Sequence, residues 1–402
     1  MKVGIIVRKL NVKGGVQRQA LSVARELRSN GHVVRLYTFT YSTECFPELI
    51  EDIAINVLPT NLHLPTDGIF GLLGEYRMAR RLARMIDRDL DILHPHDSGA
   101  HIVSFFYKLY VKNIPSVWYM NELSSMRWPP KLLSYVEDPE YHAIPRRSLL
   151  IKKISILLKT MLERFFIVRQ DLILVLSNYH RDLLRHYTGK DSIVIHSGVD
   201  VEKFPYQEHA LYEKGKELLL LSNGIFMPYR RYEDIVLALP FLIEMGYNPK
   251  LFILGAYETD GFYHQALINL ADRLKVLNRV VFFGSYTDVE LLGFLMKSHI
   301  FVFPHLQSQG LSVYEAMAVG LPSIVAPLLN TYETVEDGRD IIKVPPKDPL
   351  SIALAVNRLC VDRELYRALS VNGARLMREK LTWRAYALAI ERELEKLVLN
   401  PD

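Results

Sequence analysis

Short apolar runs alternate with amphipathic helical patterns along the first half of the chain. Residues 2–8 have the pattern of a buried strand, and residues 16–27 then place apolar side chains on one face of a helix. Further strand patterns lie at residues 33–39, 92–93, 116–120, 172–176 and 192–196. This alternation predicts an α/β fold, with a doubly wound parallel sheet covered by helices on both faces.

The same alternation begins again after a polar stretch at residues 204–209. Strand patterns follow at residues 218–221, 251–254, 280–283, 300–303 and 323–326, and helical patterns at 235–245, 262–275, 289–297, 311–319, 349–380 and 383–399. We therefore expect two Rossmann-like domains that face a cleft, 1–205 and 206–382, with the terminal helix 383–402 packing back on the first. Open parallel sheets bind ligands at the carboxyl ends of their strands, so the cleft is the expected site.

Composition excludes several classes of protein. The 402 residues include 49 Lys and Arg against 45 Asp and Glu, a balance that is too even for a chain built to neutralise nucleic acid. Cys45 and Cys360 lie far apart, so neither a disulfide framework nor a zinc site is expected, and a reducing cytoplasm is the default location. No apolar run approaches the length of a spanning helix, and residues 1–7 do not form a signal peptide.

Gly14 and Gly15 follow the first predicted strand and open the first helix. Two glycines allow a close backbone approach, and a helix N-terminus offers free N–H groups to a phosphate. A tight turn with nothing bound explains the pair equally well. The spacing is not GxGxxG, which disfavours a nicotinamide enzyme.

A second glycine lies between the strand that ends at Pro304 and the helix that follows it. The amides near Gly310 and Leu311 can receive a diphosphate, and Glu315 is expected in the first turn of that helix. A carboxylate there suits hydrogen bonds from sugar hydroxyls, such as those of a ribose. The alternative is a glutamate that is favoured only by the helix dipole.

In its motifs the chain resembles the retaining glycosyltransferases of family four, which have the GT-B fold. The family pattern Glu-x-Phe-Gly-x-x-x-x-Glu-Ala-Met-Ala followed by Gly-x-Pro is matched in its second half at residues 310–322. The resemblance continues in family order at residues 14–17, 177–179, 196–200, 204, 283–284, 333–338 and 383. It therefore covers nearly the whole chain.

The resemblance implies a nucleotide-sugar donor bound mainly by the second domain and an acceptor bound mainly by the first. It implies that Glu315 holds the donor ribose, and that Gly15 and the amides of Gly310 and Leu311 touch the diphosphate. Arg231, with Arg230, occupies the place of the family's basic pair, where cations would stabilise the charge of the leaving diphosphate. A solvated helix start is the alternative for these arginines.

Two positions depart from the family pattern. Gln307 replaces the glutamate that contacts the donor sugar, and an amide can still donate and accept hydrogen bonds there. On the acceptor side, Asn121 and Glu122 stand where many members have a histidine, and Glu122 is expected to act as a base or to orient the acceptor. The polar residues His96 and Asp97, at the end of an earlier strand, are further acceptor-side candidates, although a histidine at a strand end is often only a turn residue.

Residues 145–170 are apolar and cationic, with Glu163 as the one acid. This composition suits a helix on an anionic membrane surface, and it suits a helix packed on the first domain as well.

Together these features predict a retaining hexosyltransferase that acts on a hydroxyl acceptor, which is a glycan or a lipid-linked molecule. We expect no cofactor or metal ion, because no Asp-x-Asp is present where one is needed and arginines can serve the diphosphate. The expected location is cytoplasmic, with peripheral contact at the inner face of the membrane. A nucleotide-sugar 2-epimerase and a catalytically silent nucleotide-sugar-binding subunit are the alternatives.

Overall fold

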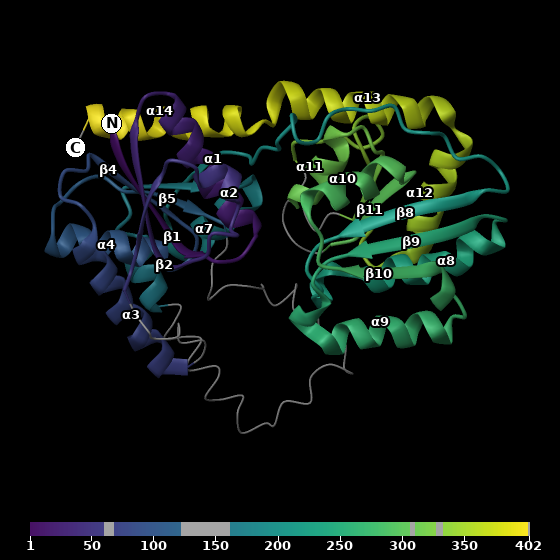
Figure 1. Cartoon of the computed structure of the whole chain (residues 1–402), viewed down its shortest axis with the longest axis horizontal. Coiled ribbons are helices and arrows are strands. Elements are labelled where there is room, and N and C mark those ends of the chain that lie inside the picture. The colour runs from purple at the N-terminus through teal and green to yellow at the C-terminus, as the bar shows by residue number, and fades with distance from the viewer. Residues whose placement is uncertain (60–67, 122–160, 306–309, 327–332, 401–402) are drawn as a thin grey trace. The chain divides into compact units, whose positions relative to one another are not determined.

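The computed structural model describes residues 1–59, 68–121, 161–305, 310–326 and 333–400. Its contacts divide the chain into two compact units (Figure 1). Unit 1 comprises residues 1–197 and 383–402, and unit 2 comprises residues 198–382. The division falls shortly before the expected boundary at residue 205, and it assigns the terminal helix to unit 1.

Unit 1 is built on a seven-stranded sheet in the order β3-β2-β1-β4-β5-β6-β7, and every paired strand is parallel. The order reverses beside β1, so that β1 and β4 flank the topological switch point of this sheet. The strands are β1 (Lys2–Leu10), β2 (Val33–Tyr41), β3 (Ala54–Val57), β4 (Ile92–His96), β5 (Val117–Met120), β6 (Leu172–Val175) and β7 (Ile193–Val194).

Helices of unit 1 cover a sheet whose central strands are almost wholly buried. They are α1 (Gly15–Ser29), α2 (Pro47–Ile50), α3 (Gly68–Met85), α4 (Ala100–Tyr110), α7 (Asn178–Thr188) and α14 (Trp383–Leu399). The last of these, α14, packs on α1, although the two helices lie at opposite ends of the sequence (Figure 1).

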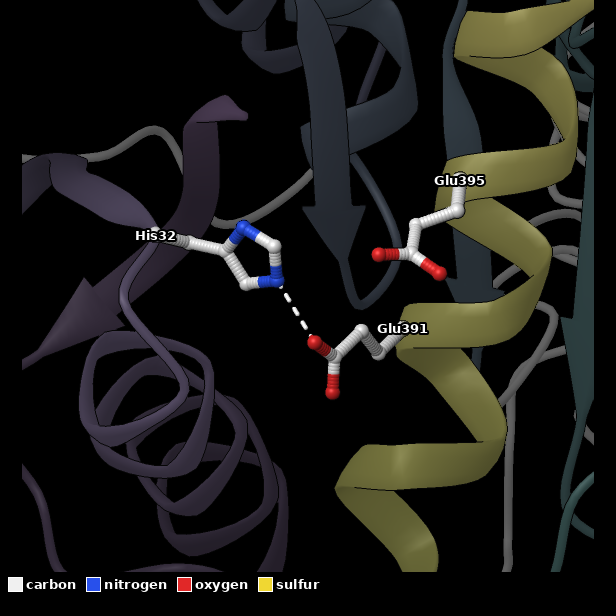
Figure 2. A group of neighbouring side chains, drawn as sticks. All are labelled: His32, Glu391 and Glu395. Carbon is white, nitrogen blue, oxygen red and sulfur yellow. Dashed lines mark hydrogen bonds and ion pairs between the residues drawn. The ribbon is translucent and has the colours of Figure 1, made fainter.

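Polar contacts fix α14 to unit 1 in addition to its buried apolar side chains. His32 Nε2 lies 2.6 Å from Glu391 Oε1 (Figure 2). The side-chain amide of Asn30 donates to Glu391 Oε2 at 2.7 Å. The ring of Tyr386 meets that of Tyr119 edge-on, with 5.4 Å between their centroids.

Unit 2 is built on a six-stranded parallel sheet in the order β10-β9-β8-β11-β12-β13. The order reverses between β8 and β11, which makes this pair the switch point. The strands are β8 (Glu217–Asn223), β9 (Asn248–Leu254), β10 (Val280–Gly284), β11 (Ile300–Phe303), β12 (Ser323–Val325) and β13 (Ile342–Lys343).

Helices again connect the strands of unit 2, and α11 lies within its main hydrophobic core. The α-helices are α8 (Tyr232–Glu244), α9 (Gly261–Arg273), α10 (Asp288–Lys297), α11 (Leu311–Ala318), α12 (Pro349–Val361) and α13 (Arg363–Lys380). Short 3-10 turns are η1 (Pro228–Arg230), η2 (Tyr257–Asp260) and η3 (Leu277–Arg279).

These sheets confirm the prediction of two doubly wound α/β domains, and they correct three details. The helix expected over residues 349–380 is two helices, because the side chain of Asp362 accepts a hydrogen bond from Leu365 N and caps the second one. The short strands β3 and β13 have no counterpart in the sequence prediction. Glu315 is the fifth residue of α11 and therefore lies beyond its first turn.

Candidate nucleotide-sugar site

The carboxyl ends of β8 and β11 bring several predicted donor-site residues to one edge of the unit 2 sheet. Arg230 follows β8, while Gly310 and Leu311 follow β11 and open α11. Val313 N donates to Gly310 O at 3.1 Å, while the amides of Leu311 and Ser312 precede the first i→i−4 bond of the helix, which makes this end a favourable place for an anion. Arg230 and the start of α11 thus follow the two adjacent strands that form the switch point.

Gly224 and Gly255 bring the backbone segments that follow β8 and β9 into close contact. Both have positive φ angles, 144° and 153°, and a Cβ on Gly255 would lie 1.8 Å from the carbonyl oxygen of Gly224. A Cβ on Gly224 would lie 3.3 Å from Cζ of Arg230. Neither position can carry a larger side chain without a local shift, so the guanidinium of Arg230 lies against bare backbone.

Arg230 has a neutral hydrogen-bond partner. Its Nη1 lies 2.6 Å from Nδ1 of His305, which is fully buried and comes directly after the Phe303-Pro304 end of β11. Burial, followed by the charge of Arg230, holds the pKa of His305 well below its usual value. The ring is therefore neutral at physiological pH.

Arg231 points to acidic partners within unit 2. Its Nε and Nη2 donate to both carboxylate oxygens of Asp234, at 3.1 and 2.6 Å, and its Nη1 lies 2.7 Å from Glu233 Oε1. Asp234 is 1% exposed, and burial raises its pKa despite this pairing. The contacts favour Arg230 over Arg231 as the cation for a diphosphate, while the predicted role of Arg231 stays a prediction.

Glu315 is 5% exposed and lies between core residues of α11. A buried carboxylate is costly unless it has polar partners. Its place one turn inside the helix suits contact with a group beyond the diphosphate. The prediction that Glu315 holds the ribose is not tested by the structure alone.

In unit 1, two residues predicted for the donor diphosphate and two predicted for the acceptor side lie at or after the ends of adjacent strands. Gly14 and Gly15 follow β1, His96 ends β4, and Asn121 follows β5. Asp97 adopts a positive φ of 75°, donates its backbone N–H to Tyr119 O at 3.2 Å, and accepts from Ser98 N through its own carboxylate at 2.6 Å.

Gly14 lies beside the side chain of Gln17. It forms the N-cap of α1, and a Cβ at this position would lie 2.6 Å from Oε1 of Gln17. The Gln17 side chain folds back across the turn and donates from Nε2 to Lys9 O at 2.9 Å. The contact with the flexible end of Gln17 does not require a glycine at position 14, and the predicted diphosphate contacts of Gly14 and Gly15 stay predictions.

His96 is fully buried, and burial, followed by His94, lowers its pKa well below the usual value. Its ring stacks on Tyr119 at 5.5 Å and meets His94 at 4.3 Å. Among the described residues, neither ring nitrogen of His96 nor Nδ2 of Asn121 has a hydrogen-bond partner. Such groups are costly to bury. The predicted place of His96 and Asn121 on the acceptor side stays a prediction.

Two predicted residues, Glu122 and Gln307, lie outside the described residues. The sequence analysis also missed His305, Gly224 and Gly255. Their position directly after a buried strand was the available signal, because ligands of open parallel sheets bind there.

Within the described part of the chain, one group of side chains has the spacing of a metal site. Ligand atoms of His32, Glu391 and Glu395 lie within 4.8 Å of one another (Figure 2). Both oxygens of Glu391 already contact His32 or Asn30, and Glu395 is exposed. The docking of α14 on unit 1 accounts for this group. The expectation that the donor site needs no metal stays a prediction.

Comparison with known proteins agrees with this geometry. The family model described as "Glycosyltransferase Family 4" matches residues 13–203, and the model described as "Glycosyl transferases group 1" matches residues 178–376. The chain therefore belongs to the group 1, family 4 glycosyltransferases and has the GT-B fold.

Relatives extend over nearly the whole chain at low identity. A phosphatidyl-myo-inositol mannosyltransferase of Mycobacterium leprae is 24% identical over 411 residues, covering 100% of this chain and 98% of its own. An uncharacterised glycosyltransferase of Methanocaldococcus jannaschii is 24% identical over 379 residues, covering 92% of each chain.

Solved structures share the fold. Anabaena HepE, in complex with UDP and glucose, matches with a TM-score of 0.75 at 16% identity, covering 99% of this chain and 100% of its own. WaaG, a glycosyltransferase of lipopolysaccharide biosynthesis, matches with a TM-score of 0.67 at 15% identity, covering 97% and 99%. In the described residues, no helix has the length and apolar character needed to cross a membrane.

Proposed function

We propose that this glycosyltransferase is a retaining hexosyltransferase, which moves a sugar from a nucleotide diphosphate to a hydroxyl of a glycan or lipid-linked acceptor without a metal ion. The observation that carries the proposal is the position of Arg230 and of the N-terminus of α11, which follow the two adjacent strands β8 and β11 at the switch point of unit 2. Cleavage of the donor's glycosidic bond leaves negative charge on the diphosphate. A guanidinium and a helix N-terminus are suited to stabilise that charge.

In this account Glu315 accepts hydrogen bonds from the ribose hydroxyls, as the resemblance implies. The acceptor hydroxyl attacks on the face from which the diphosphate departs, and the departing phosphate oxygen takes its proton. His96, Asp97 and Asn121 are proposed to line the acceptor side of unit 1. Gln307 and Glu122 keep their predicted roles at the donor sugar and at the acceptor.

The relatives guide the choice of donors and acceptors for the test. The protein is incubated with UDP-, GDP- and ADP-hexoses, with vesicles that contain phosphatidylinositol, and with soluble glycans. Release of nucleoside diphosphate and NMR of the anomeric proton are followed. We expect acceptor-dependent release and a product with the donor's anomeric configuration.

Each alternative gives a different result in the same assay. An inverted anomer contradicts retention, and activity lost with a chelator contradicts metal independence. Epimerised sugar without an acceptor identifies a 2-epimerase. Nucleotide binding without release from any donor identifies a silent subunit.

We further propose that the acceptor lies at an anionic membrane surface. The expected surface segment, residues 145–170, is described from residue 161 onward. There Met161 and Phe165 are 62% and 42% exposed, and the guanidinium of Arg169 lies 3.6 Å from the ring centroid of Phe165. Exposed apolar side chains beside cations are typical of contact with lipid headgroups.

Helix α3 extends this basic surface. Its arginines at positions 77, 80, 81 and 84 are all exposed, and Arg80 and Arg84 lie over the ring of Tyr110 on α4, at 4.6 and 5.5 Å. Phe166 joins the three segments, because its ring lies 5.2 Å from Tyr76 of α3 and 5.1 Å from Phe105 of α4. Helices α3 and α4 and residues 161–169 therefore pack together through the buried ring of Phe166, and exposed arginines lie on α3 and at Arg169.

Flotation with vesicles tests this surface. The protein is expected to float with anionic vesicles at low salt and less at high salt, because surface attraction is screened. The double variant Arg80→Glu, Arg84→Glu should lose flotation, while Arg273→Glu, Arg367→Glu, which has the same charge change on exposed arginines of unit 2, should keep it. Equal flotation with neutral vesicles would contradict the proposal.

A further inference from the structure

The packing and the hydrogen bond of His305 hold its ring in one position, and the proposed function gives that ring no role. It is fully buried at the carboxyl end of β11, and its ring centroid lies 3.4 Å from that of Phe303 and 5.7 Å from that of Tyr232. Its Nδ1 lies 2.6 Å from Nη1 of Arg230. The imidazole thus connects the two strands of the switch point, β11 through the backbone and β8 through Arg230.

The protonation of this ring follows from its contact. A guanidinium nitrogen only donates hydrogen bonds, so Nδ1 must accept and the proton of the neutral ring lies on Nε2. Burial and the charge of Arg230 both oppose a second proton. His305 therefore acts toward Arg230 as an uncharged acceptor.

An uncharged hydrogen-bond acceptor leaves the charge of an arginine in place, whereas a carboxylate compensates it. In the described residues Arg231 forms ion pairs with Glu233 and Asp234, which compensate its charge. Arg230 forms no ion pair with any residue that the structure describes, and its hydrogen bond to His305 leaves its charge uncompensated. An arginine held in this way is oriented and still attracts an anion.

We infer that His305 is a positioning residue, which orients the Arg230 guanidinium for the departing diphosphate without neutralising it. This inference rests on the proposed function, because it needs a diphosphate at the switch point of unit 2. It adds to that function a requirement at position 305, namely a hydrogen-bond acceptor that has no charge.

Asn and Asp have nearly the same shape but differ in charge. Substituting each for His305 separates the need for a hydrogen-bond acceptor from the need for an uncharged one. Asn at position 305 can accept a hydrogen bond through its amide oxygen, while Asp accepts equally well but adds a negative charge. We expect His305→Asn to keep kcat/KM within about 5-fold of wild type, and His305→Ala to lose about 10- to 100-fold. His305→Asp should lose at least as much as His305→Ala, because a carboxylate compensates Arg230 and repels the diphosphate.

A double-mutant cycle connects the effect to Arg230. His305→Ala should cost little in an Arg230→Ala background, because the guanidinium that it orients is gone. Equal costs in both backgrounds, or a His305→Asp variant as active as His305→Asn, would overturn the inference. Thermal melting of each variant identifies losses that come from unfolding.

Calorimetry with UDP and GDP keeps this test separate from that of the proposed function. If the wild type binds neither nucleotide and transfers no sugar, the proposed function fails and the inference fails with it. If the wild type binds and the folded Asn, Asp and Ala variants all match its affinity and turnover, only the inference fails.

Discussion

Two neighbouring arginines just before α8 differ in their partners, and the roles proposed for them rest on this difference. Arg231 adopts a left-handed φ of 54° and forms a bidentate contact with Asp234 three residues later, while Arg230 contacts His305 across the sheet. The sequence predicts a basic pair here but cannot separate its members. The direction of each side chain depends on a backbone angle and on a histidine 75 residues further along the chain.

The contacts of Arg231 predict that its loss affects folding more than chemistry. Arg231→Ala leaves the buried Asp234 carboxylate without its ion-pair partner, which costs about 3 to 5 kcal/mol in comparable cases. Urea unfolding should show this loss, and Arg231→Ala with Asp234→Ala should recover part of it. A stable Arg231→Ala variant with greatly reduced kcat would instead restore Arg231 as the diphosphate cation.

At the scale of elements, the strands that carry the site could be predicted from their apolar runs, and two short strands could not. β3 has no buried residue, and β13 has two residues, so neither gives a distinct hydrophobic pattern. The start of α11 at Leu311 agrees with the prediction, but the turn that carries Glu315 does not. Helix α11 begins directly after Gly310, which packs against the ring of Phe303. The sequence pattern alone does not predict that contact.

Gly310 is predicted to fix α11 against β11. A Cβ at this position would lie 2.2 Å from Cζ of Phe303, so Gly310→Ala must displace the ring or the helix start. We expect a loss of about 1 to 3 kcal/mol in stability and weaker nucleoside diphosphate binding, measured by urea unfolding and calorimetry.

Gly293→Ala in α10 is the matched control. A Cβ there meets nothing within 4 Å, so this variant should be as stable as the wild type or more stable by up to about 1 kcal/mol. Equal nucleotide affinity in the Gly310→Ala variant would show that the start of α11 does not contact the diphosphate.

At the scale of the whole molecule, the two units could be predicted from the repeated βα pattern, but the contacts of α14 could not. Glu391 lies 359 residues from the His32 ring that it contacts. No local pattern encodes such a pair. The fold of unit 1 therefore depends on residues from both ends of the chain. Unit 1 also contains several buried histidines.

Unit 1 is predicted to lose stability in mild acid. Burial lowers the pKa values of His94, His101 and His180 to about 4, whereas an unfolded chain has histidine pKa values near 6.5. The unfolded state therefore binds more protons than the folded state between these values. Each histidine makes its full contribution to the free energy of unfolding above about pH 6.5. Below that pH this contribution falls by about 1.4 kcal/mol per pH unit.

Tryptophan fluorescence measures this effect in unit 1, because all three tryptophans, Trp118, Trp128 and Trp383, belong to that unit. Urea unfolding at pH 7.5, 6.5 and 5.5 should give a falling free energy, and His94→Asn should make the fall shallower. A free energy that does not change over this range would contradict the assigned pKa shifts.

We propose that unit 2 binds the donor diphosphate where β8 and β11 end, between Arg230 and the start of α11. Hydrogen–deuterium exchange with and without saturating UDP or GDP tests it most directly. We expect slower exchange in peptides that cover residues 223–232 and 310–318, and no such slowing in an Arg230→Ala, Glu315→Gln variant that remains folded. Slowing confined to residues 1–197, or unchanged in the folded double variant, would contradict it.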